Sequence, residues 1–119
     1  MEGRIDNLGR PVVEVTISGR RGDITCPAII DTGFDGEICL PVEVAVQLGL
    51  ELAGIQSVML ADGTIKKELV FIGKVSLGKR EEEARIILTE ARDTLLGTGL
   101  LWDSKLEIDF SQFTVEIKQ

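Results

Sequence analysis

Alternation of apolar and polar residues along much of the chain predicts a protein built largely from β-strands. Residues 11–18 (PVVEVTIS) form one such pattern, and GRRGD (19–23) supplies a turn. Residues 24–31 form a second strand, in which Pro27 favours an edge position or a bend. The two strands make a hairpin that carries Asp31 at its far end.

Further strand patterns follow. Residues 55–61 and 64–71 flank a turn at Asp62-Gly63, a dipeptide typical of two-residue hairpin loops. The polar run at 66–68 predicts that this hairpin extends into solvent. Two more strands, 73–77 and 84–88, are joined by LGKREEE, which we interpret as a solvated turn. The C-terminal KLEIDF-SQ-FTVEIK predicts a hairpin or a pair of outer strands.

Helical signals are few. A short strand at 37–40 precedes PVEVAVQLGL, where Pro41 fits a first helical position and Gly49 a stop. The predicted apolar face of this helix, about two turns long, comprises Val42, Ala45, Val46 and Leu48. We therefore expect a single, closed, mostly-β domain over residues 1–119, with one or two short helices.

Composition narrows the classes of function. The chain has 119 residues and is 44% hydrophobic, which is enough for a core without disulfides or a structural metal. Its net charge is -7 and it has no basic cluster, so nucleic acid is not an expected partner. No signal-peptide core and no stretch of about 20 apolar residues is present. We expect a cytoplasmic protein without membrane partners, and reduced Cys26 and Cys39.

The chain contains no histidine and no tyrosine. Ser-His-Asp triads, Cys-His pairs and histidine-based zinc sites are therefore excluded within it. No spacing of acidic residues resembles a calcium-binding loop, so we expect no metal and no cofactor. Any catalysis must use carboxylates, lysine, hydroxyls or the backbone.

The stretch AIIDTGFDG (28–36) places a carboxylate directly after an apolar strand. Asp-Thr-Gly alone is a short pattern that commonly marks a turn. Here a DG-tipped hairpin follows about 30 residues later, and TLLGTGLLW (94–102), in which LLG opens a short apolar helix, follows about 60 residues later. This order resembles the retropepsin-like aspartic proteases. DTGF followed by LP, LGL and LADGT is similar to a small prokaryotic group of them, and the resemblance runs from about residue 12 to 117.

The resemblance implies a closed retropepsin-like β-barrel, the acid protease fold in a single lobe. It implies that Asp31 is catalytic, that the Thr32 hydroxyl bonds to a partner loop, and that Gly33 lets a substrate backbone approach. The remaining implied roles fall on the tip and wall of a flap over the substrate (Met59, Leu60, Ala61, Asp62, Gly63) and on residues packed behind the active loop (Leu95, Leu96, Gly97).

Alternatives stay open at three positions. Asp35 either grips the substrate backbone, as an acidic residue does in retroviral members, or is a solvated turn carboxylate. Phe34 departs from the alanine usual after DTG, and its ring either lines a substrate pocket or narrows the cleft. The hairpin at Asp62-Gly63 is either a flap or an ordinary surface hairpin.

The sequence contains one Asp-Thr-Gly, whereas two-lobed aspartic proteases have one such loop in each lobe. A two-fold homodimer would bring Asp31 against its own copy. The leading hypothesis is therefore a homodimeric aspartic endopeptidase acting on peptides or proteins. The alternative is a retropepsin-like module, weak or inactive in catalysis, that binds peptides or dimerises.

Overall fold

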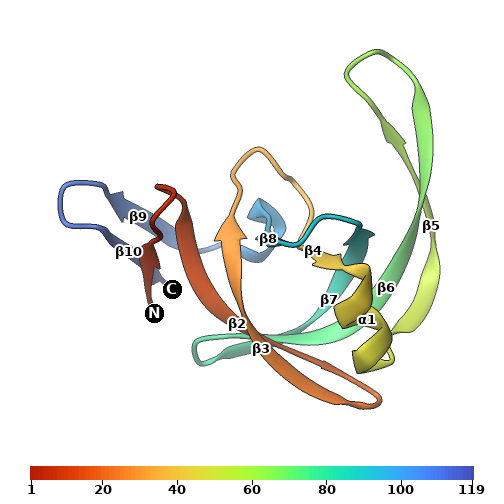
Figure 1. Ribbon diagram of the computed structural model, residues 1–119, viewed down its shortest axis with the longest axis horizontal. Helices are drawn as coiled ribbons and strands as arrows, with labels where there is room; N and C mark the ends of the chain where they lie inside the picture. Colours follow the sequence, from red (N-terminus) through yellow and green to blue (C-terminus); the bar gives the residue numbers. More distant parts are fainter.

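A computed structural model describes all of residues 1–119 and shows a mostly-β chain (Figure 1). One short α-helix and one turn of 3₁₀ helix accompany ten strands. The elements are β1 (Glu2–Ile5), β2 (Pro11–Gly19), β3 (Gly22–Ile30), β4 (Ile38–Pro41), α1 (Val42–Leu48), β5 (Glu51–Met59), β6 (Ile65–Leu77), β7 (Arg80–Thr89), β8 (Thr94–Leu96), η1 (Thr98–Leu100), β9 (Lys105–Asp109) and β10 (Thr114–Lys118).

Six strands close into a barrel in the order β6-β7-β4-β8-β3-β2, because β6 pairs with both β7 and β2. Alternating residues of β2 point into the core, and Val13, Val15 and Ile17 are completely buried. This is the period-2 pattern read from the sequence. The prediction of a closed, mostly-β domain is confirmed. None of the helices is long and apolar enough to cross a membrane.

Pro27 lies at an edge, as its sequence context indicated. The strand β3 pairs with β2 through Pro27, whereas its pairing with β8 on the other side begins only at Ala28. The missing N–H of proline is therefore tolerated. Both Cys26 and Cys39 are free thiols.

The terminal strands extend the sheet beyond the barrel in the order β2-β1-β10-β9. The predicted C-terminal hairpin is confirmed, and β9 is an outer strand. The strand β1 was not predicted, because EGRI (2–5) is short and contains one large apolar residue. It forms by pairing with distant residues, and the Met1 ammonium donates a hydrogen bond to the Ile117 carbonyl at 2.6 Å.

The prediction of two strands at 64–71 and 73–77 is wrong: β6 is one continuous strand. Gly73 lies within this strand and does not interrupt it. The absence of a side chain at Gly73 lets Ile86 of β7 pack closely against the strand. A Cβ there would lie 2.8 Å from Cδ1 of Ile86. The predicted charged turn is also shorter, since β7 begins at Arg80 and Gly78, with φ +64°, makes the turn with Lys79.

The helix α1 ends at Gly49 as predicted, with Gly49 in the left-handed region. Pro41 is not its first residue but closes β4 in an extended conformation. The buried face of α1 is narrower than the predicted apolar face. Ala45 and Leu48 are buried, whereas Val42 and Val46 are exposed, because only one narrow side of this short helix touches the barrel.

Candidate active site

Asp31 follows the last residue of β3 and is half-buried. Its backbone N–H donates to the carbonyl of Leu96 at 3.0 Å, which continues the parallel pairing of β3 with β8. The side chain itself accepts the N–H of Gly33 at Oδ1, at 2.9 Å. The apolar strand thus delivers a carboxylate to a fixed position at the rim of the barrel.

The residues after Asp31 form a tight turn, in which the Phe34 N–H donates to the Asp31 carbonyl at 3.1 Å. Thr32 and Gly33 are exposed. A Cβ on Gly33 would lie 3.3 Å from Oδ1 of Asp31, so glycine keeps this side of the carboxylate open. The hydrogen bond from the Thr32 hydroxyl to a partner loop stays a prediction.

The segment Leu95 to Gly97 lies directly behind this turn. Ile29 and Ile30 of β3 pair with Leu95 and Leu96, the second of which is fully buried. Beyond β8, three backbone N–H groups donate to carbonyls of the Asp31 loop: Gly97 to Glu37 at 2.8 Å, Thr98 to Phe34 at 2.9 Å and Gly99 to Gly36 at 2.9 Å. The loop is therefore held by backbone contacts along its length.

The ring of Phe34 packs on this same support. A Cβ on Gly36 would lie 2.6 Å from Cε1 of the ring, and a Cβ on Gly97 would lie 2.7 Å from Cδ2. Two glycines thus make room for the large residue after Asp-Thr-Gly. The ring also lines the cavity described below, and its role toward a substrate stays a prediction.

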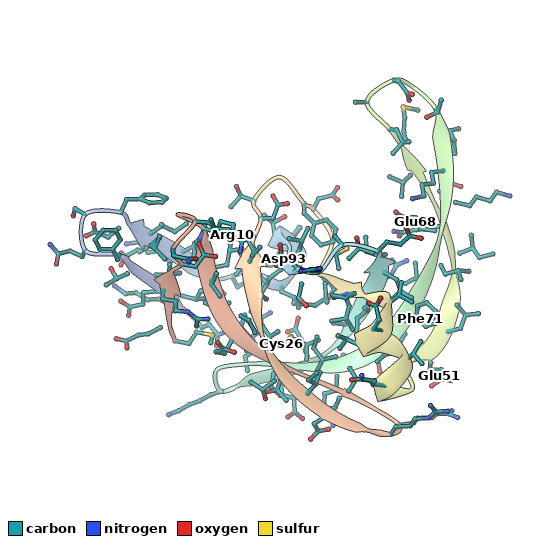
Figure 2. All side chains as sticks on the ribbon, in the orientation of Figure 1. Arg10, Cys26, Glu51, Glu68, Phe71 and Asp93 are labelled. Carbon is teal, nitrogen blue, oxygen red and sulfur yellow. The ribbon has the colours of Figure 1, made fainter.

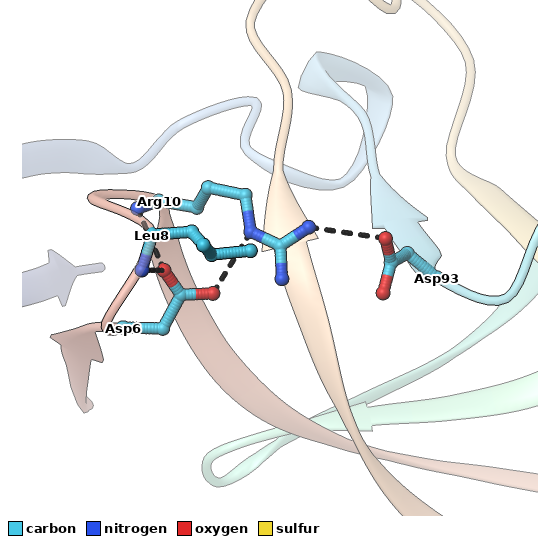
Figure 3. A network of polar contacts seen from close by, with 4 residues as sticks. All are labelled: Asp6, Leu8, Arg10 and Asp93. Atoms are coloured by element: carbon cyan, nitrogen blue, oxygen red, sulfur yellow. Dashed lines mark hydrogen bonds and ion pairs between the residues drawn. The ribbon is translucent and has the colours of Figure 1, made fainter.

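An ionic network joins the loop between β1 and β2 to the segment before β8, close to the end of β3 (Figure 3). Arg10 contacts Asp6 at 2.8 Å through Nε and Asp93 at 3.0 Å through Nη1. Asp6 also accepts the backbone N–H groups of Arg10 and Leu8. These hydrogen bonds, the one from the Arg10 backbone above all, lower the pKa of Asp6.

The β5–β6 hairpin rises from one side of the barrel and extends beyond it (Figure 1). Its turn differs from the predicted two-residue loop. Leu60 N–H donates to the Thr64 carbonyl at 2.8 Å, so the loop comprises the three residues Ala61, Asp62 and Gly63. Gly63 has φ +86°, as the third position of such a loop requires. The Thr64 hydroxyl and N–H donate to Asp62 and lower its pKa.

The hairpin tip has little to pack against. Met59 is 72% exposed and Leu60 is 45% exposed, and β5 pairs with no strand other than β6. We expect amide hydrogen exchange at residues 58–67 to be faster than at Ile24–Ile30 by about tenfold or more, because local opening breaks few contacts. Exchange measured by mass spectrometry that is equally slow in both segments would contradict a mobile flap.

A cavity of about 310 Å³ lies between the middle of this hairpin and the loop after Asp31. Phe34 and Asp35 line it, whereas Ala61, Asp62, Gly63 and Asp31 do not. Sequence reasoning missed its other polar residues, which are Glu37, Gln56, Glu68 and Arg85. Glu68 lies midway along the β5–β6 hairpin (Figure 2) and belongs to the run interpreted as a solvent-exposed arm. It is nevertheless half-buried and accepts a hydrogen bond from Gln56 at 3.4 Å.

No group of three or more Cys, Asp and Glu side chains is placed to hold a metal ion. The chemistry that the site offers is that of a carboxylate, held at the end of an apolar strand and open on the side of Gly33. A single closed barrel with one Asp-Thr-Gly loop, supported from behind by a Leu-Leu-Gly segment, defines the single-lobed acid protease class.

The sequence comparisons assign the family. A family model described as aspartyl protease matches residues 13–101. The chain belongs to this aspartyl protease family. A search of curated proteins finds no match.

Solved structures show the same fold. The chain is similar to a retropepsin-like aspartic protease from Rickettsia conorii, with a TM-score of 0.67 and 20% identity, over 99% of this chain and 88% of the other. It is also similar to EIAV protease complexed with the inhibitor HBY-793, with a TM-score of 0.63 and 21% identity, over 82% of this chain and 91% of the other. The predicted retropepsin-like barrel is confirmed.

Proposed function

We propose that the protein is an aspartic endopeptidase that works as a homodimer, with Asp31 from each chain forming one catalytic pair. The observation that carries this proposal is the single Asp31 loop in a member of the aspartyl protease family. The sequence has no second Asp-Thr-Gly: Asp62, Asp93 and Asp103 are followed by Gly-Thr, Thr-Leu and Ser-Lys. A second catalytic carboxylate therefore has to come from a second chain.

The exposed position of the loop supports such a pairing. In Figure 1 the loop between β3 and β4 lies on the side of the barrel to which the flap hairpin rises. A two-fold axis through this side brings each residue near the axis against its own copy. Asp31 would then face Asp31 of the second chain, and the exposed Thr32 hydroxyl could donate to the partner loop.

The pair would activate water by sharing one proton. At a separation of about 3 Å and an effective dielectric constant of about 20, two carboxylates repel each other by about 5 kcal/mol, so both do not ionise together near neutral pH. The ionised carboxylate accepts a proton from a water molecule that attacks the peptide carbonyl. The protonated one donates to the carbonyl oxygen, and a proton later reaches the leaving amine.

The peptide would lie between this pair and the flap. Gly33 leaves room for its backbone, Phe34 and Asp35 contribute to a side-chain cavity, and Ala61, Asp62 and Gly63 close over it as the flap tip. Leu95, Leu96 and Gly97 position the loop from behind. This mechanism uses no cofactor, and the cytoplasmic location stays a prediction from the sequence.

Mixing chains tests the shared site. If random dimers form, adding an equal amount of Asp31→Asn chains lowers the activity per wild-type chain to about one half, and a threefold excess lowers it to about one quarter. Sedimentation at high micromolar concentration should show the dimer. Undiminished activity in the mixtures, or a strictly monomeric protein that cleaves peptides, would exclude the proposal. A stable dimer without cleavage would favour the binding-module alternative.

A further inference from the structure

The cavity beside the Asp31 loop combines an apolar wall with charged groups. The rings and branched side chains of Phe34, Ile38, Val58, Val70 and Ile87 make up the wall. Four charged residues line the same space: Asp35 and Glu37 from the loop, Glu68 from β6 and Arg85 from β7. A chamber of this kind accommodates a side chain with an aliphatic stem and a polar head.

The charges in this cavity are not balanced. Three carboxylates face one guanidinium, which gives the lining a formal charge of -2. None of these four residues takes part in any of the eight ion pairs of the protein. The chain therefore places three carboxylates in this space and only one cation, that of Arg85.

Two of the three carboxylates, Glu37 and Glu68, are half-buried and retain capacity for a hydrogen-bond donor. Glu37 is half-buried, accepts only the backbone N–H of Arg85, at 3.3 Å, and has a pKa raised mainly by burial. Glu68 is half-buried and accepts only the amide of Gln56, at 3.4 Å. A carboxylate has room for about four hydrogen bonds. A cationic donor entering here would meet partially desolvated acceptors, where attraction is stronger than in bulk water.

The cavity lies within reach of a peptide held at Asp31. Phe34 is three residues from Asp31, and three residues of chain span at most about 11 Å, which is also the length of about three residues of an extended peptide. The flap strands supply the opposite wall through Gln56, Val58, Glu68 and Val70. A side chain within about three residues of the scissile bond can therefore enter the space.

We propose that this cavity selects a lysine or arginine side chain of the substrate, with the stem against Phe34 and Ile38 and the cationic head between Glu37, Glu68 and Asp35. This inference rests on the proposed peptidase function and names the class of peptide that the site prefers. Arg85 opposes the cation and limits the preference. The specificity-determining residues are then Glu37, Glu68 and Arg85, none of which belongs to the Asp-Thr-Gly loop.

Peptide capture on a cleavage-deficient protein tests the preference separately from catalysis. Immobilised Asp31→Asn protein is incubated with random hexapeptides, and the retained peptides are sequenced by mass spectrometry. We expect enrichment of lysine and arginine over the input. Adding Glu68→Gln should lower this enrichment about threefold to tenfold, and adding Arg85→Gln should raise it. Both effects should shrink at high ionic strength.

A matched control separates the cavity from the general acidity of the protein. Glu83→Gln makes the same change of net charge on β7, at an exposed residue that does not line the cavity, and should leave the enrichment unchanged. If Glu68→Gln does not fold, as judged by circular dichroism, Asp35→Asn takes its place. Equal losses with Glu83→Gln, retention of apolar or acidic peptides instead, or no retention would overturn the inference.

The same measurements distinguish the two proposals. Wild-type protein that cleaves peptides without a basic preference leaves the peptidase function standing and removes the cavity inference. Protein that enriches basic peptides in the Glu68-dependent manner, but cleaves none as wild type, retains the cavity inference and removes the peptidase function.

Discussion

Replacing Asp31 with asparagine is expected to lower peptide cleavage by about a thousandfold or more while leaving the dimer intact or tighter. Asparagine keeps the volume of the side chain but provides neither a base for the attacking water nor an acid for the carbonyl oxygen. The measurement is hydrolysis of a mixed peptide library from pH 3 to pH 8. Activity of the wild type should peak on the acidic side of neutrality, where the pair holds a single proton.

The same substitution should change the pH dependence of association. Two ionised carboxylates repel each other across the dimer, so wild-type dimers should weaken with rising pH more than Asp31→Asn dimers do. Sedimentation at acidic and alkaline pH measures this difference. Asp103→Asn is the matched control, because it changes an exposed carboxylate whose positive φ of 62° asparagine tolerates. Cleavage by Asp31→Asn at the wild-type rate would remove Asp31 from the mechanism.

Replacing Gly97 with alanine is expected to lower the free energy of unfolding by about 2 kcal/mol or more. A Cβ at this position would overlap the carbonyl oxygen of Gly36 and press on the Phe34 ring. The neighbouring N–H of Gly97 bonds to Glu37, so a shift of β8 to relieve the overlap would break the support of the Asp31 loop. Urea unfolding measures the loss, and peptide cleavage should fall with it.

The control for Gly97→Ala is Gly54→Ala. Gly54 lies in β5 with no heavy atom within 4 Å of its would-be Cβ, so alanine there meets no obstacle. Its effect on stability should be small, at about 0.5 kcal/mol. Equal effects of the two substitutions would show that the contact of Gly97 with Gly36 does not hold the loop.

Local signals in the sequence predicted the parts of the fold that depend on neighbours along the chain. The alternation in β2 and β3 and the left-handed Gly49 are properties of short segments. The strand β1 and the continuous β6 are not, because each forms through pairing with residues far away in the sequence. In the sequence, Gly73 indicates the end of a strand, and only its contact with Ile86 in the structure explains why β6 continues through it.

The same distinction between local and distant contacts applies to the candidate site. Asp31 could be found from the sequence because its strand, hydroxyl neighbour and glycine are contiguous. The cavity could not, since Glu37, Glu68 and Arg85 come from three separate elements. Glu68 stands between Lys67 and Leu69 in a polar run. It lines the cavity because successive side chains of β6 point to opposite faces, and Glu68 is on the face toward the cavity.

Because β6 is unbroken, the β5–β6 hairpin and the barrel share one strand. Its first half is an arm of the hairpin, whereas Lys74 to Ser76 pair with β2 in the barrel wall. The second half of β6 therefore anchors the hairpin in the barrel wall. The register shift in β5 between Leu52 and Gly54 lies at the foot of the hairpin, where the pairing of β5 with β6 is locally irregular. We expect bending at this point to leave the strands around Asp31 paired, because β3 and β8 pair with neither β5 nor β6.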